Sequence, residues 1–444
     1  MLTLCKTPLR AALLLCLLGA RAAAAPPGNE TVPEAVPAPD AVLPPGPAPP
    51  PPEAGFGGLA SLWDPRTSPF IPIPEIGTDP NSGTTVGILP VFLTSNDKGE
   101  ITRIVAPDVI YNPVLGYGAD FRVLDYPSQD AQWSIVGGAD EHIQRGLDAM
   151  YTDGLLRQDD WSRTFHFLYD RNATDRFFGF GNNSRYSAQS NYTLEQASME
   201  VAYGWNVNPD LQIAIASRPR LLRIEQGVFA NLPATQAAFP NVPGYGATRD
   251  VLNRLFIAYD TRDSTIIPTR GGEVLVFAGM SERWLLSSTS YALYGTDIKE
   301  FIPLTPRVTF AGHIDAQYMP VGNDTPFWAL SQLGGDRSIP SEQGLLRGFG
   351  QGRFVDRNMF SATAELRTKV FSVDLFSTSL TVEAAPFVDV GRVFHNAADI
   401  PIEGLHKVLG LGFRGIASPF IVGYVDIGYG SEGPAIFSGI NYPF

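Results

Sequence analysis

Arg347 is the residue of the sequence that most clearly indicates a specific site. It lies within the glycine-rich segment Leu345–Phe354. A guanidinium group keeps its charge in proteins, so an Arg347 folded into the interior would need carboxylates that accept paired hydrogen bonds. Glu365 and Asp389 fall at polar positions of two alternating segments, where such a side chain could reach. Gly348 would let the loop backbone approach those segments closely. The alternative is an exposed loop arginine, with the two acids only solvating a polar surface.

Motifs that would indicate catalysis are absent from the sequence. There is no G-x-S-x-G nucleophile motif, and the five histidines show no spacing typical of a zinc site. The segment Gly428–Gly433 matches G-x-G-x-x-G, but no helical pattern follows it, so we interpret it as a hairpin turn. We therefore expect no catalytic residue, no cofactor and no metal site, and a protein that is not an enzyme.

The composition limits the classes of protein to which this chain could belong. The chain has 444 residues, of which 17% are charged and 11% are aromatic, with a formal net charge of −13. The low charged fraction and the high aromatic content are typical of a sheet with one apolar and one polar face. The acidic balance argues against nucleic acid as a partner, because binding to phosphates requires a basic surface.

The first 59 residues are expected to lie outside the folded domain. Lys6 and Arg10 precede an apolar run, and small residues follow at 22–25, which is typical of a signal peptide over residues 1–25. A retained N-terminal anchor is the alternative. Both cysteines, Cys5 and Cys16, fall in this segment, so no disulfide is expected to stabilise the mature chain. Residues 26–59 are rich in proline and predict an extended tether.

From residue 60 to residue 444 the dominant pattern is alternation with a period of two, which predicts β-strands. Between Arg307 and Tyr318, for example, Phe310 and Ile314 share one face while His313 and Asp315 share the other. A soluble sandwich would bury the apolar face, whereas a transmembrane barrel would turn it to lipid. The signal peptide and the continuous alternation favour an all-β, antiparallel transmembrane barrel. The length of this region predicts about sixteen strands.

The end of the chain supports a membrane barrel. Ile440, Tyr442 and Phe444 alternate and finish on an aromatic residue, as the last strand of an outer-membrane barrel does. We interpret these residues as the assembly signal. Pro443 removes a ladder donor, which predicts either a weak closing seam or a frayed terminus.

Three motifs occur in order in the second half of the sequence. They are Asp260–Asp263 with Pro268, Gly271 and Gly272; the segment Leu346–Phe349 in its glycine-rich loop; and the segments Ala364–Arg367 and Phe387–Phe394. Together they resemble the BamA/TamA superfamily of outer-membrane proteins, the bacterial surface antigen barrels. The resemblance is strongest over residues 250–444, and before residue 250 only the strand pattern supports it.

The resemblance implies that the loop enters the barrel lumen and that Arg347, followed by Gly348 and Phe349, pairs with Glu365 and Asp389. We name this arrangement the lumen latch. The resemblance also implies a location in the bacterial outer membrane, contact with its lipid, and assistance from the barrel assembly machinery during biogenesis. Family members normally carry periplasmic POTRA modules, whereas this sequence shows only the proline-rich tether, which predicts a member without them.

Two functions of different classes remain open from the sequence. The first is a barrel for assembly or translocation, which moves an unknown protein or lipid cargo. The second is a passive pore or a structural surface antigen without insertase activity, in which the loop narrows the channel.

Overall fold

The computed structural model describes residues 71–79, 81, 83–96, 101–128, 130–320, 324–375, 378–396, 399, 403–417 and 421–444. All of them belong to one compact unit, Gly57–Phe444. The expected signal peptide and the expected tether lie outside the described residues, so both stay predictions. No helix among the described residues is long and apolar enough to cross a membrane.

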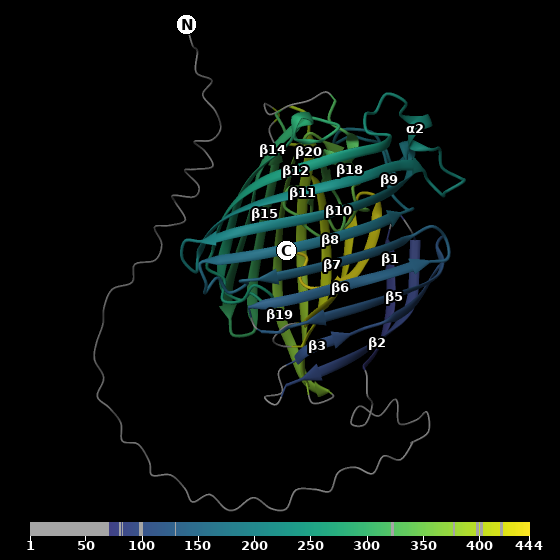
Figure 1. Ribbon diagram of the computed structural model, residues 1–444. Helices are drawn as coiled ribbons and strands as arrows, with labels where there is room; N and C mark the ends of the chain where they lie inside the picture. Colours follow the sequence, from purple (N-terminus) through teal and green to yellow (C-terminus); the bar gives the residue numbers. More distant parts are fainter. Residues whose placement is uncertain are drawn as a thin grey trace, which may run out of the picture. The chain divides into compact units, whose positions relative to one another are not determined.

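The described strands form one large antiparallel sheet that closes on itself (Figure 1). Its first half contains β1 (Ile71–Asp79), β2 (Gly83–Ser95), β3 (Ile101–Val105), β4 (Asp108–Asn112), β5 (Gly116–Asp125), β6 (Ala131–Asp140), β7 (Arg145–Asp153), β8 (Trp161–Asn172), β9 (Arg176–Phe177) and β10 (Ser190–Asn206). Its second half contains β11 (Leu211–Gln226), β12 (Gly246–Asp260), β13 (Gly271–Ser281), β14 (Tyr291–Thr305), β15 (Val308–Tyr318), β19 (Asn358–Leu375), β20 (Thr378–Phe394), β21 (His406–Ala417), β22 (Ile421–Gly430) and β23 (Gly433–Ile440).

The expected all-β barrel architecture is confirmed, but the expected count of sixteen strands is not. The sheet contains 20 strands among the described residues. Two of them, β3 and β4, lie in one row and are separated by Ala106 and Pro107, because proline cannot donate to the ladder. The short strand β9 pairs only with β10. The ring therefore has eighteen rows, which the alternation pattern alone could not count.

The two faces of the sheet follow the alternation in the sequence. On β11, Ile215 and Leu221 are 62% and 60% exposed on the outer face, whereas Ala216 and Leu222 point inward and are buried. Aromatic residues gather on the outer face near the strand ends, where Trp161 pairs in register with Trp205 and Trp133 with Tyr151. Such girdles are typical of the two interfaces of a membrane barrel.

The ring closes between its first and last strands with little pairing. Only one residue pair, Thr78 with Ile436, registers between β1 and β23 among the described residues. The neighbouring pair β22 and β23 registers from Gly423–Ile440 to Gly430–Gly433. This last pairing confirms that the G-x-G-x-x-G string is a hairpin turn. The seam is therefore held by far fewer ladder hydrogen bonds than its neighbours.

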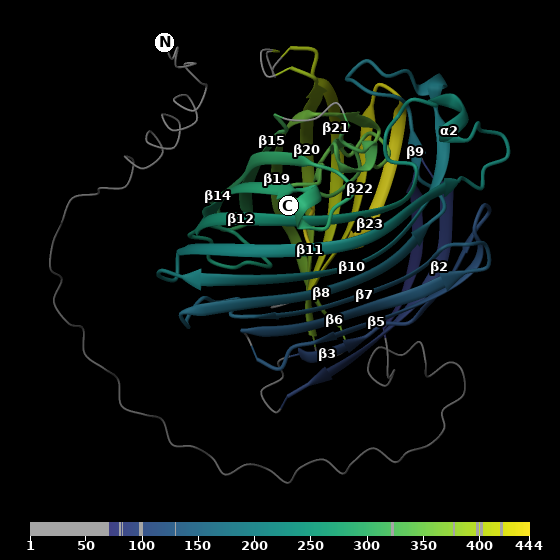
Figure 2. The same ribbon diagram turned by 45° about the horizontal axis from the view of Figure 1, so that its top comes forward.

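Between β15 and β19, the described residues 319–320 and 324–357 form a long loop that folds inside the ring (Figure 2). It carries a small sheet of β16 (Ser331–Leu333), β17 (Gln343–Gly344) and β18 (Phe354–Asp356), with β16 in the middle. The short helices of the described chain are η2 (Tyr186–Ala188), α2 (Thr235–Ala238), η3 (Arg283–Leu285) and η4 (Phe327–Ala329). We call the described residues 319–320 and 324–357 the lumen loop.

Candidate functional site

The lumen loop places Arg347 against the inner face of the barrel. Leu345, Leu346 and Arg347 are completely buried. The Arg347 guanidinium donates from Nε and Nη2 to the two carboxylate oxygens of Asp389, at 2.9 and 2.8 Å, in a bidentate arrangement. Its Nη1 donates to Glu365 at 3.0 Å, so the structure brings together the three residues that the sequence singled out.

The backbone and the face of the same guanidinium are also engaged. The amide nitrogen of Arg347 donates to Asp389 at 3.0 Å, which fixes the loop backbone as well as the side chain. The guanidinium carbon lies 3.4 Å from the ring centroid of Phe387, at cation–π distance. Arg347 is thus held by ion pairs, by directed hydrogen bonds and by the contact of its guanidinium face with the Phe387 ring.

Three further charged residues complete the site, and the sequence analysis did not name them as partners of Arg347. Asp426 accepts from Arg347 Nη1 at 3.0 Å and also pairs with Arg414. Arg414 donates to Glu365 at 3.2 Å, and Arg367 donates to the same carboxylate at 3.3 Å. We call this set the charge cluster: Arg347, Arg367, Arg414, Glu365, Asp389 and Asp426.

The charge cluster is balanced and dry. It contains three guanidinium groups and three carboxylates, and every member is at most 2% exposed. Charges removed from water require partners, because an unpaired buried charge costs several kcal/mol. The cluster meets this requirement across four wall strands, β19 to β22, and the loop. Asp426 could have been found from sequence, since it alternates with the outward residues Val425 and Ile427 on β22.

Small residues let the loop backbone reach the wall. A Cβ on Gly348 would lie 2.8 Å from the Gly430 nitrogen and from a Val408 methyl group. A Cβ on Gly428 would overlap the carbonyl oxygen of Arg347. The glycines of the β22–β23 hairpin therefore have a second role beyond the turn. Phe349 is 1% exposed and packs edge-on against Phe354 at 5.2 Å.

On the opposite side, the same loop packs against β10 to β14 through apolar side chains. Phe327 lies 5.1 Å from Tyr192 with its ring edge-on, and Trp328 donates to the Gly244 carbonyl at 3.1 Å. The main members are all nearly buried, and we call them the apolar cluster: Phe277, Tyr291, Leu293, Phe327, Trp328 and Leu330. The inward positions of these strands are therefore not all polar, because the loop fills part of the interior and covers inward apolar residues.

Several loops meet at the end of the barrel that carries the β22–β23 hairpin. Arg353 pairs with Glu432 at 2.7 Å and donates to the backbone of Ser184 at 2.7 Å. Asn182 donates to the Gly404 carbonyl at 2.8 Å, and its own carbonyl lies 2.9 Å from a ring nitrogen of His406. These contacts join three connections, β8–β10, β20–β21 and β22–β23, to the lumen loop.

The opposite end carries the Asp260–Asp263 motif. Arg262 donates three hydrogen bonds to Asp260, two from its guanidinium and one from its amide. A Cβ on Gly271, at φ +85°, would overlap the Thr261 carbonyl. Burial alone would raise the pKa of Asp263, but hydrogen bonds from the Thr269 hydroxyl and nearby amides outweigh it and lower the pKa. The motif therefore forms the turn between β12 and β13.

The last four residues differ from the expected geometry. The strand β23 ends at Ile440, and Asn441 adopts φ +73°, so Tyr442 and Phe444 do not continue an alternating edge strand. Tyr442 is 9% exposed and turns toward the inner wall. Pro443 is buried and its carbonyl accepts from the Ser338 amide at 3.2 Å, so the terminus is packed rather than frayed, and Pro443 itself lies beyond the strand that closes the ring. Whether Ile440, Tyr442 and Phe444 act as an assembly signal stays a prediction.

Serine, histidine and aspartate side chains meet around the loop tip. The Ser338 hydroxyl donates to Asp315 at 3.3 Å and to Asp297 at 3.4 Å, while His313 contacts Asp297 at 2.8 Å. No hydrogen bond joins Ser338 to His313 in the described part of the chain. The described residues also contain no group of three or more potential ligands placed to hold a metal ion.

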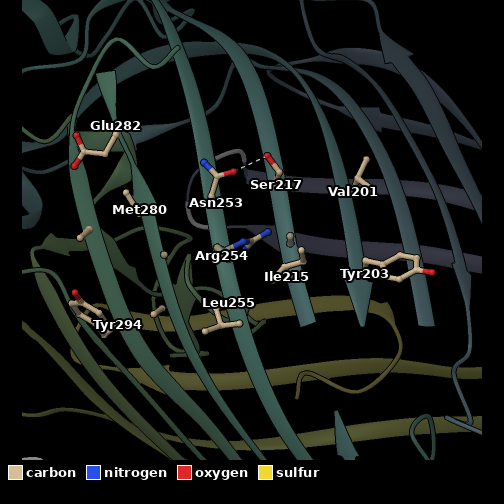
Figure 3. Close-up of a pocket in the computed structure, with 14 residues that line it drawn as sticks. Val201, Tyr203, Ile215, Ser217, Asn253, Arg254, Leu255, Met280, Glu282 and Tyr294 are labelled. Carbon is tan, nitrogen blue, oxygen red and sulfur yellow. Dashed lines mark hydrogen bonds between the residues drawn. The ribbon is translucent and has the colours of Figure 1, made fainter. Parts of the chain in front are cut away.

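The outer face carries a recess of about 820 Å³ over β10 to β14 (Figure 3). Tyr203, Ile215 and Leu255 line one row of it, and a hydrogen bond of 2.9 Å joins Ser217 to Asn253 in the next. Figure 3 shows the Arg254 side chain among these residues; its guanidinium pairs with Glu200 and donates to Ser341 of the lumen loop. The recess thus lies on the wall behind the apolar cluster.

Comparison with known proteins places the chain in a family. The model of the Omp85 superfamily domain matches residues 131–407, which begins upstream of the motifs and includes the charge cluster residues Arg347, Glu365 and Asp389. No curated protein matches the sequence.

Two solved structures are similar to this chain. BamA from Haemophilus ducreyi lacking POTRA domains 1–3 is 15% identical, with a TM-score of 0.48 over 86% of this chain and 76% of that chain. CdiB from Escherichia coli is 12% identical, with a TM-score of 0.46 over 85% of this chain and 63% of that chain.

No POTRA module occurs among the residues that the structure describes. The family match and the membrane-facing barrel place the protein in the bacterial outer membrane. The chain belongs to the Omp85 superfamily.

Proposed function

We propose that this protein is an assembly or translocation barrel of the outer membrane, closed at rest by the lumen loop. In this proposal Arg347 holds the loop to Glu365, Asp389 and Asp426, and the loop blocks the channel. The cargo is a protein or a lipid. Outer-membrane lipid surrounds the barrel, and the barrel assembly machinery inserts it.

The single observation that carries the proposal is the complete burial of Arg347 among three carboxylates from three different wall strands. A passive pore needs a wet channel and gains nothing from a buried ion network that fixes a loop to one wall inside it. Such a network does fix one position of a loop, because each pair has a preferred direction.

The seam supports movement of cargo in the same barrel. Among the described residues only one pair registers between β1 and β23, so most of the edge groups described there have no ladder partner across the seam. Separating them would cost much less than separating β19 from β20, which register over fifteen positions. The seam is therefore the place where a strand or a lipid could leave the barrel sideways.

Single-channel recording on the purified barrel in planar bilayers tests the proposal. We expect the wild type to stay closed for most of the record and Arg347→Ala to show frequent, large openings. Arg223→Ala, on an exposed side chain, is the matched control and should behave as the wild type. A large, steady conductance of the wild type would support the passive pore instead. A closed Arg347→Ala barrel would show that the loop does not depend on Arg347.

A further inference from the structure

The outer face carries a second recess besides the one shown in Figure 3. It has a volume of about 660 Å³, and its lining residues include Leu221, Arg249 and Ser288. We call it the rim recess, and we call the recess of about 820 Å³ the wall recess. Ser217 and Asn253 of the wall recess are in register, and so are Leu221 and Arg249, four residues away on each strand. The two recesses therefore follow each other along β11 and β12, about 13 Å apart.

The strand β12 shows at which depth of the membrane each recess lies. Its outward residues run from Tyr259, which is 52% exposed, through Ile257, Leu255 and Asn253 to the exposed Arg249. The ten residue steps from Tyr259 to Arg249 correspond to about 33 Å of strand, and to about 25 Å of height at the tilt of membrane strands. This height matches the apolar band of a membrane barrel. The wall recess therefore faces hydrocarbon, and the rim recess lies at the level of the lipid headgroups.

The wall recess has the shape and the dryness that an acyl chain requires. Its hollow lies over Ala278, a short outward residue in register between the longer Leu255 and Tyr294 of the neighbouring strands. The Ser217 hydroxyl donates to the Asn253 side chain at 2.9 Å, and Asn253 donates to a backbone carbonyl of its own strand at 3.3 Å. Hydrocarbon offers no hydrogen bonds, so polar groups in such a wall must be satisfied internally. An acyl chain can thus fill the recess without leaving these groups unpaired.

Two arginines flank Ser288 at the rim recess. The Arg249 amide donates to the Ser288 hydroxyl at 3.1 Å, and the Ser288 amide donates to the Arg249 carbonyl at 2.8 Å. Nε of Arg283 donates to the Ser288 carbonyl at 3.2 Å. Both arginines are exposed, and no carboxylate of the described residues pairs with either guanidinium. Two positive charges therefore stay uncompensated at the level of the headgroups.

The carboxylates on the same side of the barrel do not neutralise these two arginines. Glu195 and Glu225 pair with Arg171, at 3.2 and 3.0 Å. Glu282 lies at one side of the wall recess (Figure 3) and forms no ion pair among the described residues. Its charge would repel a phosphate from the wall recess. A bound lipid is therefore oriented, with an anionic headgroup in the rim recess and its hydrocarbon in the wall recess.

We propose that the two recesses form one binding site for a lipid with a phosphorylated, anionic headgroup. One acyl chain lies in the wall recess over Ala278, and the phosphate accepts hydrogen bonds from Arg249 and Arg283 at the rim recess. A guanidinium suits this role, because it stays charged and binds phosphate with paired hydrogen bonds. The site goes beyond the proposed function, since it requires neither a cargo nor an open channel.

Native mass spectrometry of the detergent-solubilised barrel tests the site. The two probes are phosphatidylglycerol, which is anionic, and phosphatidylcholine with the same acyl chains, which carries no net charge. We expect one phosphatidylglycerol to bind the wild type about tenfold more tightly than phosphatidylcholine. Arg249→Gln should weaken phosphatidylglycerol binding about fivefold, because it removes one of the two arginines at the headgroup. Equal affinities of the wild type for the two lipids, or an unchanged affinity in Arg249→Gln, would overturn the headgroup site.

Filling the wall recess tests the position of the acyl chain. Ala278→Phe should weaken phosphatidylglycerol binding about tenfold, since the ring occupies the space of the chain. Arg163→Gln and Ala149→Phe are the matched controls, because both residues lie on the outer face of β7 and β8 and line neither recess. Both controls should bind as the wild type does. Heat-modifiable gel mobility checks that each variant is folded.

Two further outcomes would overturn the proposal. Wild-type affinity in Ala278→Phe would show that no acyl chain lies in the wall recess. A barrel that is dimeric without added lipid, and monomeric as Ala278→Phe, would show that a second copy of the chain covers the recess instead. Neither outcome bears on the conductance of Arg347→Ala, so failure of the lipid site is distinguishable from failure of the proposed function.

Discussion

The lumen loop meets two walls of the same barrel with opposite chemistry. Toward β19–β22 it presents Arg347 to the charge cluster, and toward β10–β14 it presents Phe327 and Trp328 to the apolar cluster. Apolar burial is strong but has little directional preference, whereas a bidentate ion pair fixes distance and angle. The difference indicates that the apolar side supplies most of the free energy of loop docking and the charged side sets its position.

The largest effect should come from removing the central charge. Arg347→Ala leaves the carboxylates of Glu365, Asp389 and Asp426 facing one another without their shared guanidinium. We expect it to lower the free energy of unfolding by about 4 kcal/mol, as breaking a buried ion network does. Urea unfolding in lipid vesicles measures the loss, and heat-modifiable gel mobility reports on folding. Arg223→Ala should change either readout very little, and an unchanged stability in Arg347→Ala would show that the cluster is not needed.

A substitution on the apolar side should lower the free energy of unfolding slightly less. Phe327→Ala removes a ring that is 2% exposed, and we expect a loss of about 3 kcal/mol from the cavity and the lost burial. The position of Arg347 should persist, so the channel should open less often than in Arg347→Ala. The control is Trp284→Ala, on a side chain that is 73% exposed. If Phe327→Ala opened the channel as fully as Arg347→Ala, the division of roles between the two walls would be wrong.

A smaller effect is expected where the loop backbone touches the wall. Gly428→Ala would place a methyl group against the Arg347 carbonyl, and we expect a loss of about 2 kcal/mol from the forced displacement. Gly423→Ala, on the same strand β22, is a close control, because a Cβ there has no atom within 4 Å. Comparison of the two by urea unfolding isolates the contact. Equal losses would indicate a general cost of alanine in this strand.

The sequence predicted the strands of the barrel wall better than the residues that fill the lumen. Alternation placed Glu365 and Asp389 correctly on the inner face, because lipid on one side leaves only one position for a charge. The inward Phe277 and Leu293 follow the opposite rule, since the loop rather than water covers them. No local sequence pattern indicates that these two residues are covered, because the residues that cover them lie far away in the sequence.

The sequence predicted only part of the charge cluster, again because some of its members lie far from Arg347 in the sequence. A motif can mark Arg347 and its nearest partners, but the inclusion of Asp426 and Arg414 depends on where the loop docks along β21 and β22. The turn at Asn441 depends on a single positive φ, which the alternation of Ile440, Tyr442 and Phe444 does not indicate. The strand count failed because it assumed one average length for a strand and its connection, whereas eighteen rows fit in this region and some connections are only two residues long, such as 306–307 and 431–432.

Hydrogen exchange of the segment 344–350, measured by mass spectrometry on the barrel in nanodiscs, tests most directly that the loop is docked inside. The Arg347 amide donates to Asp389 and the Leu346 amide donates to the Gly335 carbonyl, and both residues are buried. We predict protection comparable to that of the wall strands in the wild type, and its loss in Asp389→Asn. Exchange in the wild type as rapid as in an exposed loop such as 282–290 would contradict the account.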